Sequence, residues 1–305
     1  MTDKPSSLLD RSGLVIVDKP AGLSSHDVVA RVRRAFHTRA VGHAGTLDPM
    51  ATGVLVLGVE RGTKFLAHLV HATKTYEAII RLGSATTTDD AEGEEISRAS
   101  AAELAEVSVE TINAAIGPFR GDIMQRPARV SAVKIDGKRA YQRVRDGEDI
   151  EIPARPVTIF SYSVSDIRPH SDHIDVDIRV QCSSGTYIRS LARDLGEALG
   201  IGGHLIYLRR TVLGHFSLED ARTLEELEKA PQLSMSLDQA LPHCYPVLDI
   251  TADQARDLSM GKWLQPVAQE GPFAAVDPDG RAIALVKQQG KRLASIFVAR
   301  PNTLN

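Results

Sequence analysis

The sequence is poor in cysteine. Only two of its 305 residues are cysteines, Cys182 and Cys244, and neither belongs to a CxxC pair or a cysteine–histidine cluster. This spacing argues against a disulfide framework and against a zinc site. We expect both cysteines to be buried thiols.

Long apolar runs are absent as well. No stretch approaches the roughly 18 consecutive apolar residues of a membrane span, and the first five residues, MTDKP, carry no apolar signal region. We therefore expect a cytoplasmic protein. A composition of 43% hydrophobic and 25% charged residues is typical of a soluble globular chain, with room for one large and one small domain.

The chain also lacks the positive net charge that is typical of nucleic-acid-binding proteins, because its formal net charge is -3. Its basic residues are nevertheless clustered. Residues 28–47 contain four arginines and no acid, and residues 124–145 contain seven basic residues and one acidic residue. This distribution suits a protein that binds phosphates with one face, and a solvated helix face or a surface loop without function is the alternative.

The most informative stretch is residues 41–58, VGHAGTLDPMATGVLVLG. Two glycines three apart allow a tight turn, and the apolar run at the end predicts a buried strand. Between them lies Asp48, and the proline after it favours an extended or turn conformation at a strand edge. Such a position suits a reactive carboxylate. An Asx-turn or helix-capping aspartate is the alternative.

Residues 42–58, GHAGTLDPMATGVLVLG, resemble the catalytic motif of the TruB family of pseudouridine synthases, which isomerise a uridine in the T-loop of tRNA. Residues 18–27, DKPAGLSSHD, resemble the opening motif of the same family. The resemblance implies an α+β fold, in which a catalytic domain over residues 1–245 has a mixed, mainly antiparallel sheet flanked by helices and loops. It also implies that Asp48 is the catalytic aspartate, that His43 lies beside the RNA and that Lys64 lies near the active-site face.

Three further segments carry candidate site residues. Residues 74–83 predict a strand with Tyr76 near its start. A tyrosine in a strand is by default a half-buried packing residue. The resemblance to the family's KTYEA motif instead implies that Tyr76 is a catalytic residue that stacks on the target base. Residues 183–196, SSGTYIRSLARDLG, predict a turn and a helix that begins near Tyr187 and Arg189. On pattern alone Arg189 is a surface residue, whereas the family motif implies that it pairs with Asp48 and that Tyr187 helps to fix the base pocket. Leu208 is a core residue by default, and the resemblance also makes it a wall of that pocket.

Residues 121–155 contain QRPARVSAVKIDGKRAYQRVRDG, which resembles the RNA-binding thumb insertion of stand-alone TruB enzymes. Its candidate RNA-binding residues are Arg126, Arg129, Lys134, Lys138, Arg139 and Arg143. Residues 246–305 predict a helix over 251–259 and strands over 273–277, 282–286 and 293–298. This order resembles a small β-rich, PUA-like C-terminal domain.

The resemblance implies conversion of uridine 55 of tRNA to pseudouridine, by base flipping and without cofactor or metal. It implies the tRNA T-arm as partner, and we expect a monomer with no protein partner. Whether Asp48 attacks the sugar, attacks the base or only removes a proton stays open. The alternatives are a non-catalytic RNA-binding protein and a hydrolase with an acidic nucleophile; a guide-RNA-directed relative is disfavoured because those enzymes lack the long thumb.

Overall fold

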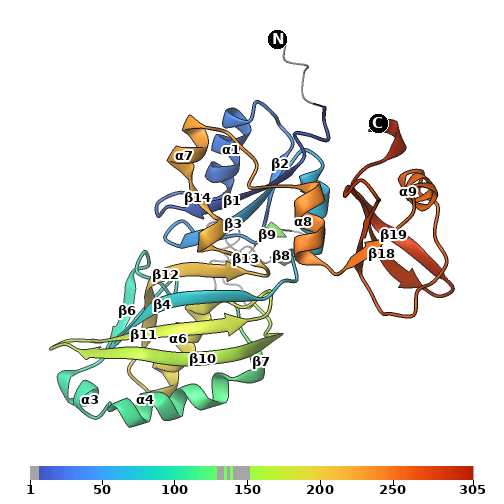
Figure 1. Ribbon diagram of the computed structural model, residues 1–305. Coiled ribbons are helices and arrows are strands. Elements are labelled where there is room, and N and C mark those ends of the chain that lie inside the picture. Colours follow the sequence, from blue (N-terminus) through green and yellow to red (C-terminus); the bar gives the residue numbers. More distant parts are fainter. Residues whose placement is uncertain (1–6, 129–133, 136–137, 140–151, 305) are drawn as a thin grey trace. The chain divides into compact units, whose positions relative to one another are not determined.

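The structure is a computed structural model that describes residues 7–128, 134–135, 138–139 and 152–304. It consists of two compact units (Figure 1). Unit 1 combines residues 1–70 with residues 213–305, and unit 2 is residues 71–212. The predicted domain boundary at residue 245 is a different division and stays a prediction. In the part of the chain that the structure describes, no helix is long and apolar enough to cross a membrane.

Unit 1 begins with an antiparallel sheet formed by β1 (Gly13–Lys19), β2 (Val41–Ala44) and β3 (Thr52–Val59). The predicted buried strand is confirmed, since every residue of β3 after Thr52 is buried. At the other edge of β1, β14 (Arg222–Thr223) pairs in parallel and β15 (Met235–Ser236) pairs antiparallel.

Helix α1 (Ser25–Ala35) follows β1 and begins with a complete capping box. The Ser24 side chain accepts a hydrogen bond from the Asp27 N–H, and the Asp27 carboxylate accepts one from the Ser24 N–H. This reciprocal pairing satisfies two N–H groups that the helix itself leaves without partners. The remaining helices and strands of unit 1 before residue 245 are α2 (Gly62–Phe65), η1 (Leu66–His68), β13 (Phe216–Ser217), η3 (Leu218–Asp220), α7 (Leu224–Lys229) and α8 (Leu237–Cys244).

The last part of the chain forms a four-stranded sheet of its own, in the order β16-β17-β18-β19. Its elements are β16 (Val247–Asp249), α9 (Ala252–Ser259), β17 (Phe273–Val276), β18 (Ala282–Gln289), β19 (Arg292–Val298) and η4 (Asn302–Leu304). Leu258, Phe273, Val286 and Leu293 are buried together in its core. The predicted helix and three strands are confirmed, whereas β16 was not predicted.

Five strands of unit 2 are paired in the order β12-β4-β11-β10-β7 (Figure 1). These are β4 (Lys74–Leu82), β7 (Gly121–Gln125), β10 (Arg155–Pro169), β11 (Ile174–Cys182) and β12 (Gly203–Leu213). The β4, β7, β10 and β11 pairs are antiparallel. Apolar residues alternate with polar ones along β11, so its apolar side is buried. The mainly antiparallel α+β fold is thus confirmed.

Helix α6 (Ile188–Ala198) packs against β4, and α4 (Val109–Ile116) packs against α6 and β10. The smaller elements of unit 2 are β5 (Ser84–Thr86), β6 (Glu95–Arg98), α3 (Ala101–Ala105), η2 (Gly117–Phe119), β8 (Lys134–Ile135) and β9 (Lys138–Arg139). Cys182 in unit 2 and Cys244 in unit 1 are both buried free thiols, as predicted.

Candidate active site

Asp48 lies in the loop between β2 and β3 and is half-buried. One side of this loop is fixed by Ser25 at the start of α1. The Leu47 N–H donates to the Ser25 hydroxyl at 2.8 Å, and the same hydroxyl donates to the Leu47 carbonyl at 3.0 Å. A single buried side chain therefore satisfies both backbone groups of the residue before Asp48.

The other side of the loop is fixed by Lys19, whose side chain is fully buried at the end of β1. Its ammonium donates to the carbonyls of Pro20 at 2.9 Å, Leu23 at 2.6 Å and Pro49 at 3.2 Å. The Pro49 carbonyl also accepts from the Gly22 N–H at 2.9 Å. Three carbonyls match the three donors of an ammonium group, which makes burial of this charge tolerable. The role of Lys19 was not predicted. The feature of the sequence that could have indicated it is a lysine at the end of an apolar strand.

The backbone at Asp48 forms a turn, in which the Ala51 N–H donates to the Asp48 carbonyl at 3.1 Å. This confirms the turn conformation that the following proline predicts. Gly45 and Gly53, on either side, have φ values of 85° and 100°, which residues with a side chain rarely adopt. All these contacts hold the loop through its backbone atoms.

Unit 1 also contains two other predicted site residues. His43 lies on β2 opposite Leu57 of β3 and is half-buried. Lys64 lies on α2 and is exposed. Their predicted roles beside the RNA stay predictions.

In unit 2, Tyr76 lies on β4 opposite Val180 of β11 and is 6% exposed. Leu208 lies on β12 and is also 6% exposed. Both side chains are therefore packed in the folded unit. Burial of this degree fits a core residue and fits a wall of a base pocket equally well.

Arg189 is 5% exposed, which excludes the surface position that its pattern alone predicts. Its guanidinium forms an ion pair with the Asp90 carboxylate at 3.3 Å, and the same nitrogen donates to the Thr88 carbonyl at 3.0 Å. Asp90 in turn accepts from the Thr88 hydroxyl at 2.5 Å and the Glu92 N–H at 3.1 Å. A buried charge pair requires such additional hydrogen bonds. Asp90 was not predicted as a partner of Arg189, and the predicted pairing of Arg189 with Asp48 stays a proposal.

Tyr187 is the residue that precedes α6, as predicted. Its backbone is held by Gln125 at the end of β7, whose amide oxygen accepts from the Tyr187 N–H at 2.8 Å and whose amide nitrogen donates to the Tyr187 carbonyl at 3.0 Å. Gln125 is 2% exposed and was not predicted. Strand β7 is therefore hydrogen-bonded directly to the start of α6.

Arg193, one turn along α6, pairs with Asp89 at 3.1 Å and with Asp194 at 2.7 Å. Burial raises the pKa of both carboxyl groups, and the Arg193 cation opposes this rise. Arg193 also donates to the Arg126 carbonyl at 2.8 Å. The first turns of α6 thus lie in a network of paired arginines and aspartates.

The predicted thumb is described only in part. Arg126 is exposed, and the described backbone places Lys134 in β8 and Lys138 and Arg139 in β9. Arg129 and Arg143 lie outside the described residues. Among the described residues, one group of side chains has the types and spacing to hold a metal ion, His170, His173 and Asp175, and none of the predicted site residues belongs to it.

Family models match most of the chain. The model of the TruB family pseudouridylate synthase (N terminal domain) matches residues 33–188. The tRNA pseudouridylate synthase B C-terminal domain matches residues 189–245, and the model named tRNA Pseudouridine synthase II, C terminal, matches residues 245–300.

Curated relatives match over nearly the whole length. The chain is 67% identical to tRNA pseudouridine synthase B of Corynebacterium diphtheriae, over 96% of this chain and 98% of that protein. It is 53% identical to tRNA pseudouridine synthase B of Rhodococcus jostii, over 99% and 98%.

Among solved structures, a crystal structure of a Cbf5-Nop10-Gar1 complex matches with a TM-score of 0.72 and 25% identity, over 100% of this chain and 92% of that chain. A structure of an H/ACA RNP bound to a substrate RNA containing 2'-deoxyuridine matches in fold, with a TM-score of 0.71 and 23% identity, over 97% and 87%. The family models, the curated relatives and this fold agree with the motif around Asp48. The chain therefore belongs to the TruB family of pseudouridine synthases, and it is an isomerase of that class.

Proposed function

We propose that the chain converts uridine 55 in the T-loop of tRNA to pseudouridine, with Asp48 as the essential group. The tRNA substrate is supported by the relatives named tRNA pseudouridine synthase B, which are 67% and 63% identical to this chain. The observation that carries the role of Asp48 is the anchoring of its loop through Ser25 and Lys19, which fixes the residue by its backbone. These contacts hold the residue at a fixed place in the loop between β2 and β3.

The reaction breaks the bond between the ribose and the uracil nitrogen, turns the base and rejoins it through carbon. These atoms are inaccessible in a folded T-loop, so the nucleotide has to be flipped out of its stack. Asp48 supplies a carboxyl group that acts as a nucleophile or as a base. No cofactor takes part in this proposal.

The other predicted residues position the base and the aspartate. Arg189 pairs with Asp48 and orients it, and Tyr76 stacks on the flipped base. Tyr187 and Leu208 line the pocket, and His43 and Lys64 contact the RNA. Asp48 and Arg189 belong to different units, so this pairing is carried by the family motifs alone.

The proposal is tested by incubating purified protein with a tRNA transcript and mapping pseudouridine at each position. Release of tritium from tRNA labelled at uracil carbon 5 measures turnover. Asp48→Asn keeps the size of the side chain and removes its charge, so turnover is expected to fall at least about 10³-fold, while tRNA binding and the thermal midpoint stay near those of the wild type. Near-normal turnover by this variant would exclude the assigned role. A transcript with cytidine at position 55 is the control for the site of modification.

Thumb binding has a separate test. Charge reversal at Lys138 and Arg139 removes two cations from the predicted RNA-binding segment, so tRNA affinity and its dependence on salt concentration are both expected to decrease. The measurement is the dissociation constant at several salt concentrations. An unchanged salt slope would show that these residues do not contact phosphate.

A further inference from the structure

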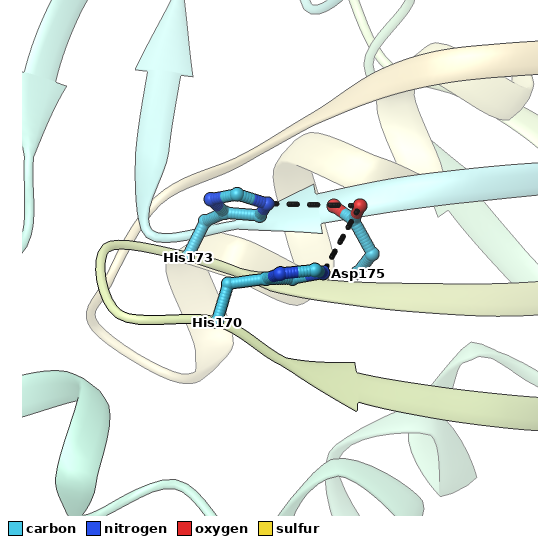
Figure 2. Close-up of side chains that lie close together, drawn as sticks. All are labelled: His170, His173 and Asp175. Atoms are coloured by element: carbon cyan, nitrogen blue, oxygen red, sulfur yellow. Dashed lines mark ion pairs between the residues drawn. The ribbon is translucent and has the colours of Figure 1, made fainter.

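The turn between β10 and β11 brings two histidines and an aspartate together (Figure 2). β10 ends at Pro169 and β11 begins at Ile174, and the His170 N–H closes the turn by donating to the His173 carbonyl at 2.8 Å. The two imidazole rings lie face to face, with centroids 4.4 Å apart and planes 20° apart. Both rings extend to the same side of the hairpin, toward Asp175 of β11.

The distances to Asp175 are longer than hydrogen bonds. The Nε2 atoms of His170 and His173 lie 3.9 Å and 3.7 Å from the same carboxylate oxygen, Oδ2, whereas hydrogen bonds of this kind are about 2.7–3.2 Å long. Two ligands of one tetrahedral zinc ion, each bound at about 2.0–2.2 Å, are roughly 3.4 Å apart. The two observed distances from Nε2 to Oδ2 are therefore close to the distance between two ligand atoms of one zinc ion. Small rotations of the side chains would bring them to that distance.

The hydrogen bonds around His173 orient its lone pair toward this position. His173 Nδ1 lies 2.7 Å from Oδ1 of Asp172. The Asp172 carboxylate accepts this hydrogen bond when the proton is on Nδ1. In that tautomer Nε2 carries a lone pair that faces the Asp175 carboxylate. A metal ion between these two groups would be bound by both of them, and a carboxylate that holds the far nitrogen is the usual support of a metal-bound histidine.

Asp175 is itself held in place by Arg81 of β4. Its side chain is 11% exposed, and Arg81 donates to its two oxygens at 2.8 Å and 2.9 Å. This two-point contact with Arg81 fixes the orientation of the carboxylate beside the two histidines. The Arg81 charge also repels a second cation, so we expect a weaker site than one with four protein ligands.

We propose that His170, His173 and Asp175 bind one divalent transition-metal ion, for which zinc is the best match, with water completing the coordination. Imidazole nitrogen and carboxylate oxygen are ligands that zinc accepts. The ion would fasten the β10–β11 turn to β4 through Asp175 and Arg81. This site was not predicted, because zinc was expected only where a CxxC pair or a cysteine–histidine cluster occurs in the sequence.

The test is a zinc titration of the full-length protein after treatment with a chelator, followed by calorimetry and by the visible spectrum of the cobalt-substituted form. We expect one ion per chain. The double variant His170→Gln, His173→Gln is expected to bind zinc at least about tenfold more weakly, and His71→Gln, which changes an exposed histidine of the same unit, is the matched control with wild-type affinity.

Two results would overturn the proposal. Saturable zinc binding that is equal in the double variant and the wild type would place the ion elsewhere. Absence of saturable binding in the wild type would show that this turn does not bind zinc. If the double variant does not fold, Asp172→Asn keeps all three ligands and removes only the support of His173; its zinc affinity is then expected to fall about tenfold, and an unchanged affinity would contradict the site.

Discussion

The two units hold their candidate site residues by different means. In unit 1 the Asp48 loop is fixed through backbone atoms, by the Ser25 hydroxyl and by the buried Lys19 ammonium. In unit 2 Arg189 is fixed through its own guanidinium, which pairs with Asp90 and donates to Thr88. The position of Asp48 therefore depends on its neighbours, whereas the position of Arg189 depends on its own side chain.

Because of this difference, we expect substitutions at the two residues to affect turnover and stability to different degrees. A change of the Asp48 side chain leaves the loop contacts in place, so its effect should appear in turnover. A change of Arg189 leaves the Asp90 carboxylate buried without this partner, so its effect should appear in folding as well. Each prediction below tests one side of this comparison.

Replacement of Arg189 is expected to have the largest effect on stability. In Arg189→Met the free energy of unfolding should fall by about 3–5 kcal/mol, since both partners are only 5% exposed and a buried charge loses its counter-ion. Urea denaturation measures this loss. Arg179→Met is the matched control, because Arg179 pairs with Glu77 in an exposed ion pair, which contributes at most about 1 kcal/mol. Equal losses in the two variants would remove the distinction between the units.

Replacement of Lys19 tests the unit 1 side. Lys19→Met removes three hydrogen bonds from a fully buried ammonium, so the free energy of unfolding should fall by about 2–3 kcal/mol. The loop should also move, and turnover should fall by about 10²-fold. Lys229→Met, an exposed lysine of the same unit, is the control for loss of a charge. Full turnover in Lys19→Met would show that this anchor does not position Asp48.

The features that could be predicted from sequence are local ones. The capping box of α1, the buried strand β3 and the start of α6 at Tyr187 depend on residues close together in the chain. Their signals are turn residues and apolar periodicity, which need no tertiary information.

The features that were missed depend on distant partners. Arg189 donates to a carbonyl 101 positions earlier, and Lys19 to one 30 positions later. Which of several acidic residues meets an arginine is set by strand register and by the turns between strands, and a single sequence does not specify either. The same reason explains why Gln125, whose partner Tyr187 lies 62 positions later, was not predicted.

Two neighbouring serines offer a sharper test of the loop. Ser25→Ala removes the hydroxyl that serves both backbone groups of Leu47, so the free energy of unfolding should fall by about 1–2 kcal/mol. Ser24→Ala removes the cap of α1 and should cost about 1 kcal/mol. The two variants are thus similar in stability, and turnover separates them: we expect a reduced kcat in Ser25→Ala alone. Equal kcat values would show that the Ser25 contact is only structural.

The smallest expected effect concerns Gln125, where unit 2 also uses a neutral side chain to fix a backbone. Gln125→Met removes both hydrogen bonds to Tyr187, so the free energy of unfolding should fall by about 1 kcal/mol. Because Tyr187 is proposed to line the base pocket, its displacement should raise KM for tRNA more than it lowers kcat. Gln181→Met, at an exposed position on β11, should change neither value. A rise in KM in Gln125→Met alone would mean that the start of α6 is positioned through its backbone, in the same way as the Asp48 loop. The difference between the two units would then apply only to their charged residues, Asp48 and Arg189.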